Sequence, residues 1–291
     1  MKYIYYPGCS LEGSAKEYDL STRAFLAAMD VELEEIAEWT CCGARAAEAV
    51  SSRLALALPA RNLAWAEKGS DIKEVLVPCS ACYLNLKKVT EKIRKDADLL
   101  ETINAVLAED DLKLKGGLRV RHLLDVVSVD LGEKQLAPRV QNSLAGLEVA
   151  PYYGCQCLRP YPAFDDPEAP RSMEALIRAT GARVFDWEMG AKCCGASHMS
   201  TKPEVGIELV SAILQAARGA DAIVTVCPMC QINLEAFQKK AARKSGQPVN
   251  ISVLYLPQLL GLAVGLSPQQ LRLDLNLAVT TPFRQKLRQV A

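Results

Sequence analysis

The stretch EVLVPCSACYLNL occupies residues 74–86, and the stretch AIVTVCPMCQINL occupies residues 222–234. Each opens with a short apolar run typical of a buried strand, continues with a Cys-x-x-Cys pair and ends in a sequence that favours a helix. Both have Asn-Leu just after the second cysteine. A strand–cysteine–helix unit that occurs twice in the sequence predicts that the chain folds as two related halves.

More cysteines precede each stretch and extend the repeat. In both halves a single cysteine comes first, then a Cys-Cys-Gly triplet, then the Cys-x-x-Cys pair, at similar intervals. Small differences in interval belong in loops, so the order of the cysteines is a property of the repeat. The first half has Cys9, Cys41, Cys42, Cys79 and Cys82, and the second half has Cys155, Cys193, Cys194, Cys227 and Cys230.

Strand and helix patterns alternate through both halves, which predicts an α/β fold. Each half should be a mostly parallel sheet flanked by helices, and a pseudo-twofold axis should relate the two halves. We place the boundary near residue 145, giving domains 1–145 and 146–291. Residues 120–130 look helical. The predicted strands are 2–6, 31–36, 74–77, 148–153, 183–187 and 222–226, and the predicted helices are 14–29, 46–68, 84–109, 171–180, 204–218 and 232–244.

The composition excludes several classes of protein. The 34 basic residues balance the 34 acidic ones, so no nucleic-acid partner is indicated. No apolar run reaches the roughly 18–20 residues of a membrane span, and the N-terminus lacks a secretory signal. We therefore expect a cytoplasmic protein without a membrane span. The apolar segment LYLPQLLGLAVGL, residues 254–266, fits a core element better than a docking surface.

Eleven cysteines in a reducing compartment indicate metal or redox chemistry, because structural disulfides do not persist there. A four-iron cluster ordinarily takes four thiolates, and each half offers five. Every cysteine group follows a predicted strand, so the groups should gather at the carboxyl edge of each sheet. Gly43 and Gly195, which follow the paired cysteines, should adopt positive φ and let neighbouring thiolates face one centre.

Other uses of these cysteines stay open. A zinc site would need four Cys or His ligands, and zinc could occupy one half or be shared by the two Cys-x-x-Cys pairs. A thioredoxin-like redox role for one pair would leave Cys9, Cys41 and Cys42 unexplained.

Three residues near the pattern carry weaker signals. Cys157 replaces Leu11 of the first half and is either a small loop residue or a spare ligand or redox thiol. His122 lies in the helical stretch and should be structural. His198, in CCGASH, could donate a proton near the second group, although a solvated loop histidine fits the pattern better.

Over essentially the whole chain, the cysteine pattern resembles the CCG domain found in the B subunit of heterodisulfide reductase. The resemblance is carried by YYPGCSLEGSAKEYDLS from residue 5, VPCSACYLNL from residue 77, YYGCQCLRP from residue 152 and CCGASHMS from residue 193. It implies two noncubane [4Fe-4S] clusters, each held by all five cysteines of one half, with a substrate disulfide cleaved or formed between them.

The resemblance also implies partners. The chain has no ferredoxin-type C-x2-C-x2-C-x3-C-P run and no GxGxxG turn, so its electrons come from another polypeptide. In the family the donors are a ferredoxin-like C-type subunit together with a flavin-bearing A-type subunit. The substrate would be a disulfide or a sulfur carrier. CCG domains also occur in electron-transfer subunits of hydroxy-acid and fumarate or succinate oxidoreductases, which remain an alternative, as does a zinc-stabilised scaffold.

Overall fold

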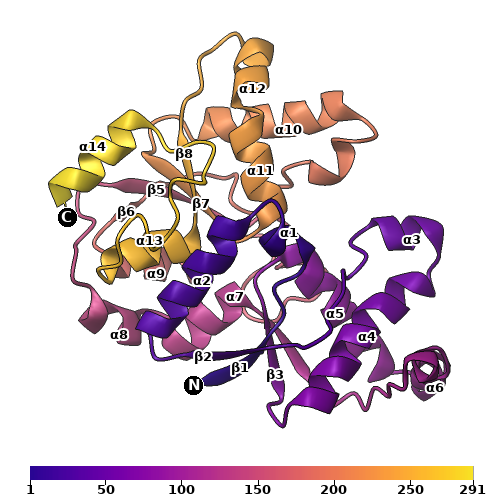
Figure 1. Ribbon diagram of the computed structural model, residues 1–291. Helices are drawn as coiled ribbons and strands as arrows, with labels where there is room; N and C mark the ends of the chain where they lie inside the picture. The colour runs from indigo at the N-terminus through magenta and orange to yellow at the C-terminus, as the bar shows by residue number, and fades with distance from the viewer. Residues whose placement is uncertain (291) are drawn as a thin grey trace.

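The computed structural model describes residues 1–290 and contains two four-stranded parallel sheets, one in each half of the chain (Figure 1). The predicted α/β class with two homologous, mostly parallel halves is therefore confirmed. The order of strands is β2-β1-β3-β4 in the first sheet and β6-β5-β7-β8 in the second. The strands are β1 (Lys2–Tyr5), β2 (Glu32–Glu35), β3 (Glu74–Val77), β4 (Arg119–His122), β5 (Glu148–Tyr152), β6 (Arg183–Val184), β7 (Ala222–Thr225) and β8 (Ser252–Tyr255).

Helices connect successive strands. In the first half they are α1 (Cys9–Glu12), α2 (Lys16–Ala28), α3 (Ala46–Val50), α4 (Leu54–Gly69), α5 (Ser80–Ile93), α6 (Ala97–Leu107), α7 (Leu123–Asp125) and α8 (Gly132–Leu136), with a π-helical stretch at Val126–Leu131. In the second half they are α9 (Ser172–Ala179), α10 (Pro203–Ala216), α11 (Pro228–Ala236), α12 (Gln238–Ser245), α13 (Leu256–Ala263) and α14 (Thr281–Val290).

The strand order decides which helices cover which face. The chain leaves β1 toward β2 on one side and returns to β3 on the other, and right-handed crossovers then place the connecting helices on opposite faces. Accordingly α2 lies on one side of the first sheet and α4, α5 and α6 lie on the other (Figure 1). Ligands bind at such a reversal point, just beyond the strand ends.

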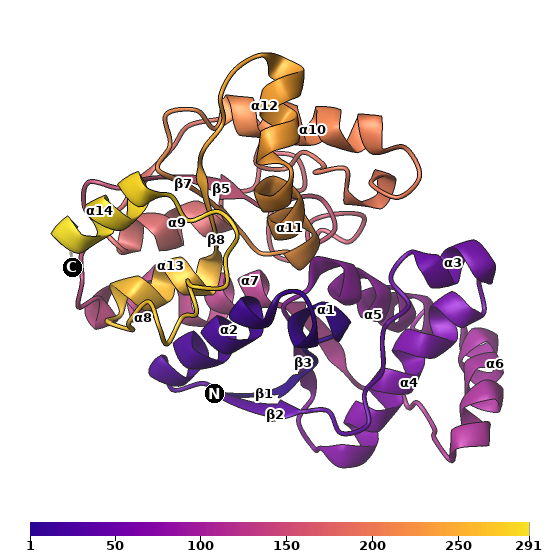
Figure 2. The same ribbon diagram turned by 45° about the horizontal axis from the view of Figure 1, so that its top comes forward.

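The two halves pack through equivalent elements. Helix α2 of the first half contacts α13 of the second, and α9 of the second contacts α8 of the first, as the pseudo-twofold relation requires. Figure 2 shows α2 lying along α13. The connecting segment is tied to the second half where the Gln141 amide donates to the Ala263 carbonyl at 2.8 Å. The boundary near residue 145 stays a prediction.

The main hydrophobic core runs through this junction and includes residues of both halves. Residues 251–264 are all buried, which confirms that the apolar segment at 254–266 is a core element. Within residues 1–290, no helix is both long enough and apolar enough to cross a bilayer.

Several predicted elements were wrong in detail. The stretch 120–130 begins as strand β4, because Arg119–His122 pairs in parallel with β3 before the chain turns helical. The predicted helix 84–109 is two helices, since the Asp96 side chain accepts the Leu99 amide at 2.9 Å and starts α6 as a new helix. Helices 46–68 and 232–244 are likewise each divided in two, and β8 was not predicted as a strand.

Candidate metal centres

The cysteines of each half come together at the carboxyl edge of its sheet. In the first half the Sγ atoms of Cys9 and Cys41 are 3.6 Å apart, and those of Cys42 and Cys82 are 3.3 Å apart. Both contacts join residues more than 30 positions apart in the chain. Figure 2 shows α1, α5 and α11, the helices that carry cysteines, gathered where the halves meet.

Shared protons link the thiols of the first group. Hydrogen bonds from Cys41 and then from Cys82 lower the pKa of Cys42 to about 3, although Cys42 is buried. The bond to Cys42 in turn raises the pKa of Cys41, and bonds to Cys42 and Cys79 raise that of Cys82. Hydrogen bonds from its neighbours therefore stabilise Cys42 as a thiolate near neutral pH. The thiolate is the form in which cysteine binds metals.

Hydrogen bonds between thiols also shift the pKa values of the second group, at other positions of the repeat. A hydrogen bond from Cys155 lowers the pKa of Cys193 to about 6, and one from Cys230 lowers the pKa of Cys227 to about 6. Bonds to Cys194 and Cys227 raise the pKa of Cys230. The second group therefore also holds thiolate close to neutral pH.

The outer members of both groups reach solvent. Cys9, Cys41 and Cys193 are exposed, and Cys155 is partly exposed. The two Cys-x-x-Cys pairs are buried instead, with Cys79 and Cys227 each standing immediately before a helix, at the start of α5 and α11. Free amide groups at these helix starts favour negatively charged sulfur. Each group therefore has a buried, electropositive side and a side open to reactants.

Two glycines leave room for the sulfurs. Gly8 has φ +77°, and a Cβ there would lie 2.8 Å from Cys82 Sγ; Gly154 has φ +72°, and its Cβ would lie 3.1 Å from Cys230 Sγ. Sequence reasoning did not single out this pair, although each stands just before the first cysteine of its half. Gly43 and Gly195 have φ +81° and +73°, as predicted.

An equivalent tyrosine in each half fixes the loop that carries the paired cysteines. The Tyr6 hydroxyl donates to the Thr40 carbonyl, just before Cys41, at 2.7 Å. The Tyr152 hydroxyl donates to the Lys192 carbonyl, just before Cys193, also at 2.7 Å. Each tyrosine stands three residues before the first cysteine of its half.

An asparagine ties the other end of each loop. The Asn85 amide donates to the Cys42 carbonyl at 3.2 Å, and the Asn233 amide donates to the Cys194 carbonyl at 3.0 Å. Asn85 also reaches Cys42 Sγ at 3.6 Å. The repeated Asn-Leu in the sequence carried the signal for these residues, but its function in holding the cysteine loop was missed.

The weaker candidates fall in different places. Cys157 is fully buried, its thiol donates to the Tyr153 carbonyl at 3.2 Å, and burial raises its pKa to about 12, so it stays protonated. His198 is partly exposed, and its charge is one of the weaker influences that lower the pKa of Cys193. His122 does not lie in a helix as expected. It ends β4 and is buried where the halves meet.

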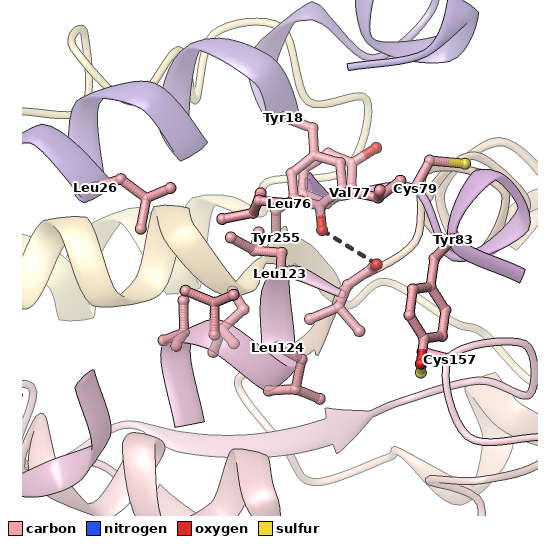
Figure 3. Close-up of a cluster of buried hydrophobic side chains, with 14 of the residues drawn as sticks. Tyr18, Leu26, Leu76, Val77, Cys79, Tyr83, Leu123, Leu124, Cys157 and Tyr255 are labelled. Carbon is pink, nitrogen blue, oxygen red and sulfur yellow. Dashed lines mark hydrogen bonds between the residues drawn. The ribbon is translucent and has the colours of Figure 1, made fainter. Parts of the chain in front are cut away.

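One hydroxyl joins the strand ends that lead into the two Cys-x-x-Cys pairs. Tyr18, on α2, is fully buried, and its Oη lies 3.1 Å from both the Pro78 and the Val226 carbonyl oxygens. Its ring stacks on Tyr255 with ring centres 3.9 Å apart (Figure 3). Pro78 and Val226 directly precede Cys79 and Cys227. The two cysteine groups therefore flank a single point at the junction of the halves.

The donor set of each group fits an iron–sulfur cluster. All five donors are sulfur, and the space that Gly8 and Gly154 leave is beside those sulfurs. Among the residues that the structure describes, no three His, Cys, Asp or Glu side chains surround the position of a single metal ion. Each group is a string of neighbouring sulfurs.

Known proteins share this arrangement. Residues 3–87 and 149–235 match the CCG cysteine-rich domain. The chain is 33% identical to the 8-methylmenaquinol:fumarate reductase membrane anchor subunit of Wolinella succinogenes, covering 96% of this chain and 98% of the relative. It is 28% identical to the B subunit of the ferredoxin/F(420)H(2)-dependent CoB-CoM heterodisulfide reductase of Methanosarcina acetivorans, covering 100% and 98%. It is also 28% identical to an Archaeoglobus profundus protein described as similar to the heterodisulfide reductase B subunit, covering 93% of each.

A solved structure shares the fold. The crystal structure of a hypothetical protein from Helicobacter pylori superposes with a TM-score of 0.78 at 16% identity, over 96% of this chain and 52% of that one. The family match covers more than half of the chain, and it falls on the two segments that carry the cysteine groups. The chain therefore belongs to the CCG cysteine-rich domain family, as a two-domain member that resembles the B subunit of heterodisulfide reductase.

Proposed function

We propose that this chain is the disulfide-cleaving or disulfide-forming iron–sulfur subunit of a heterodisulfide-reductase-type complex. Each of its two cysteine groups would hold one noncubane [4Fe-4S] cluster. The observation that carries the proposal is the convergence of both groups on Tyr18, since two centres that act on one disulfide must lie together. The proposed ligands are Cys9, Cys41, Cys42, Cys79 and Cys82 for one cluster, and Cys155, Cys193, Cys194, Cys227 and Cys230 for the other.

When bound, the clusters supply one-electron carriers, and reduction of a disulfide to two thiols takes two electrons and two protons. The residues of the chain itself would hold the two clusters and shield them from solvent. Buried Cys79, Cys82, Cys227 and Cys230 would anchor each cluster, while the exposed cysteines face the side from which a disulfide or sulfur carrier arrives. We place the substrate in a cleft between the halves. His198, whose charge helps to lower the pKa of Cys193, is a candidate for proton donor.

The proposal includes partners and a location. Because the chain lacks a ferredoxin-type motif, its electrons would come from other subunits. The resemblance to the heterodisulfide reductase B subunit implies two of them, one ferredoxin-like and one flavin-bearing. A cytoplasmic location agrees with eleven cysteines kept as thiols or cluster ligands.

A second function has its own support. The relative at 33% identity is a subunit of a fumarate reductase, so the chain could instead pass electrons within a fumarate, succinate or hydroxy-acid oxidoreductase. The clusters would then relay electrons without touching a disulfide. A zinc-stabilised scaffold is a third possibility, which no feature of the two cysteine groups favours.

Metal analysis of the full chain, purified without oxygen, separates these classes. Two four-iron clusters predict about eight iron and eight acid-labile sulfide per chain. About four iron with one zinc would make one half structural, and zinc without iron would leave only the scaffold.

Turnover decides between the two iron-containing functions. Reduced benzyl viologen serves as electron donor, with the coenzyme M–coenzyme B disulfide and, separately, a lipoyl-protein disulfide as acceptors. Oxidation of viologen that depends on a disulfide supports the proposal. Iron-loaded protein that reduces neither disulfide but passes electrons to fumarate through a partner would favour the relay function.

A further inference from the structure

The junction between the cysteine groups contains a chain of hydrogen bonds that crosses from the first half to the second. Ser80, between Cys79 and Cys82, is 2% exposed, and its hydroxyl lies 3.3 Å from the Val226 carbonyl oxygen and 3.1 Å from His122 Nε2. Ser80 belongs to the first half and Val226 to the second. A side chain inside one Cys-x-x-Cys motif therefore contacts the strand end that leads into the other.

The directions of these bonds follow from the histidine. The Leu124 amide donates to His122 Nδ1 at 3.1 Å, so Nδ1 carries no proton and the neutral ring carries its proton on Nε2. Burial lowers the pKa of His122 to about 3, which keeps the ring neutral. His122 therefore donates to Ser80 Oγ, and the Ser80 hydroxyl is left to donate to the Val226 carbonyl.

The two copies of the repeat contribute different residues to this junction, so the junction is asymmetric. Tyr18 stands nine residues after Cys9, and at the same distance after Cys155 the second half has Phe164. Ser80 corresponds to Pro228. Neither Phe164 nor Pro228 has a side chain that can donate a hydrogen bond.

Ring stacking nonetheless follows the pseudo-twofold axis. Tyr18 stacks on Tyr255, at the end of β8, with ring planes 3° apart. Phe164 lies parallel to His122, at the end of β4, also with planes 3° apart but with ring centres 6.4 Å apart. A pair of parallel rings thus occurs at equivalent places in both halves, closely stacked only for Tyr18 and Tyr255, while the hydroxyl donors of this junction come only from the first half.

The Val226 carbonyl accepts from both hydroxyls of the first half, Tyr18 and Ser80, whereas Tyr18 alone of the two reaches Pro78. A buried carbonyl that loses its donors costs free energy, so its strand end should loosen. We propose that Tyr18 and Ser80 are positioning residues that fix the second half's Cys-x-x-Cys segment against the first half. The second centre thus depends on donors from the first half, with no matching dependence in the other direction. In treating the segment as a cluster site, the inference rests on the proposed function.

Two equivalent backbone amides report on the two segments. The Tyr83 amide donates to the Cys79 carbonyl at 2.8 Å, and the Gln231 amide donates to the Cys227 carbonyl at 3.0 Å. Hydrogen exchange of both amides is measured on the anaerobically purified full chain. In Ser80→Ala we expect Gln231 to exchange roughly three- to tenfold faster and Tyr83 to stay unchanged, although Ser80 is only three residues from Tyr83.

Further variants sharpen this test. Tyr18→Phe keeps the ring stack and should accelerate both amides, because its hydroxyl serves both strand ends. Ser80→Thr keeps a hydroxyl and should restore protection of Gln231. The control is Tyr5→Phe, which removes a buried hydroxyl that bonds to Asp19 and touches neither segment. Acceleration of Tyr83 but not Gln231 in Ser80→Ala, or equal effects in Tyr5→Phe, would overturn the inference.

A second readout concerns the centre itself. In a Cys42→Ala background, which leaves only the second group complete, adding Ser80→Ala should lower the reduction potential of the remaining cluster, because the Ser80 hydroxyl is within hydrogen-bond reach of Cys227, a ligand of the second group, as well as of the Val226 carbonyl. In a Cys194→Ala background the same substitution should leave the potential unchanged. An equal shift in both backgrounds would contradict the asymmetry. If the wild-type chain holds no iron, the proposed function fails, while the exchange measurements still decide the positioning of the segment.

Discussion

The two halves of the chain differ least where they hold cysteines and most where they meet. Tyr6 and Tyr152 donate to equivalent carbonyls at the same 2.7 Å, and Asn85 and Asn233 repeat a second tie to the paired cysteines. At the junction, by contrast, a serine of the first half corresponds to a proline of the second, Ser80 to Pro228. The contacts that shape each cysteine loop have been retained in both copies, whereas the residues between the copies have diverged into separate tasks.

The comparison extends to a helix face. Lys87 on α5 forms an ion pair with Glu91 at 3.2 Å. The equivalent position on α11 is Glu235, which is buried and accepts the Ala278 amide at 3.1 Å. The same place in the repeat therefore carries a partly exposed ion pair in one half and a buried carboxyl in the other, where the backbone of residues 277 and 278 lies against it.

The largest effect should come from removing one cysteine in either half. We expect Cys42→Ala and Cys194→Ala each to abolish disulfide turnover while keeping about half of the wild-type iron, because in the proposed function the two groups act as one catalytic unit and each holds its own cluster. Iron content and spectra of both variants are compared with those of Cys157→Ala, whose thiol lies outside the repeat. Turnover retained in either variant would reduce that half to a relay or a structural element.

Substituting the glycines beside the sulfurs tests whether the halves are equally crowded. Gly8→Ala should lose iron from its group and destabilise the protein by about 2–4 kcal/mol, since positive φ and a clash add up. Gly154→Ala should do less, because its Cβ would lie 3.1 Å from sulfur and not 2.8 Å. Gly246→Ala is the matched control: φ is +69°, but nothing lies within 4 Å of an added Cβ. Equal iron loss in all three variants would mean that the strain of positive φ, and not a clash between the added Cβ and a cysteine sulfur, is the cause.

The buried carboxyl of the second half predicts a dependence on pH. Burial raises the pKa of Glu235 from its ordinary 4.5 to about 7. Between these values the folded chain binds a proton that the unfolded chain has released. Stability therefore falls as pH rises from about 4.5 to about 7, and levels off above that range.

Glu235→Gln removes that dependence. It should stabilise the protein at pH 8 by roughly 1–3 kcal/mol and leave it nearly unchanged at pH 4.5. Melting temperatures of both proteins at the two pH values measure the effect. Lys87→Gln, at the equivalent position, should show no gain at pH 8. A gain of equal size at both pH values would show that ionisation of Glu235 is not the cause.

The smallest effect concerns the two asparagines. Asn85→Ala and Asn233→Ala each remove a donor to a cysteine carbonyl and should each cost about 1 kcal/mol of stability. Only Asn85 also reaches a sulfur, so only Asn85→Ala should change the absorption or EPR spectrum of its cluster. Identical spectral changes in both would mean that the carbonyl bond, and not the contact with sulfur, influences the centre.

Much of this arrangement could be predicted from the repeat. Cysteines that follow parallel strands must meet at one sheet edge, so Cys9, Cys42 and Cys82 come together although they are far apart in the chain. Strand β4 was missed, because RVRH alternates charged residues with only one aliphatic side chain. Its stability comes from tertiary contacts: Arg121 is buried and pairs with Asp125 at 2.6 Å. The strand propensity of a short segment does not reflect such tertiary ion pairs, so it could not predict β4.

The junction could not be predicted at all. Tyr18 stands in an ordinary amphipathic helix, and Ser80 looks like a spacer between two cysteines. Their hydroxyls acquire a function only when α2 and α5 meet a strand end more than 140 residues away. Contacts between domains depend on how whole surfaces fit, which spacing within one domain does not determine.

The packing of α2 against α13 also sets the order in which the chain can mature on the ribosome. Helix α2 ends at Ala28, but the helix that covers its apolar face ends at Ala263. At ordinary rates of synthesis, roughly 10–50 seconds separate the appearance of the two. All five cysteines of the first half have been made once synthesis passes Cys82, early in that interval, while the helix that packs against α2 has still to be made. The nascent chain thus passes through a stage in which chaperones can reach α2 and the first cysteine group is uncovered on the side of the second half.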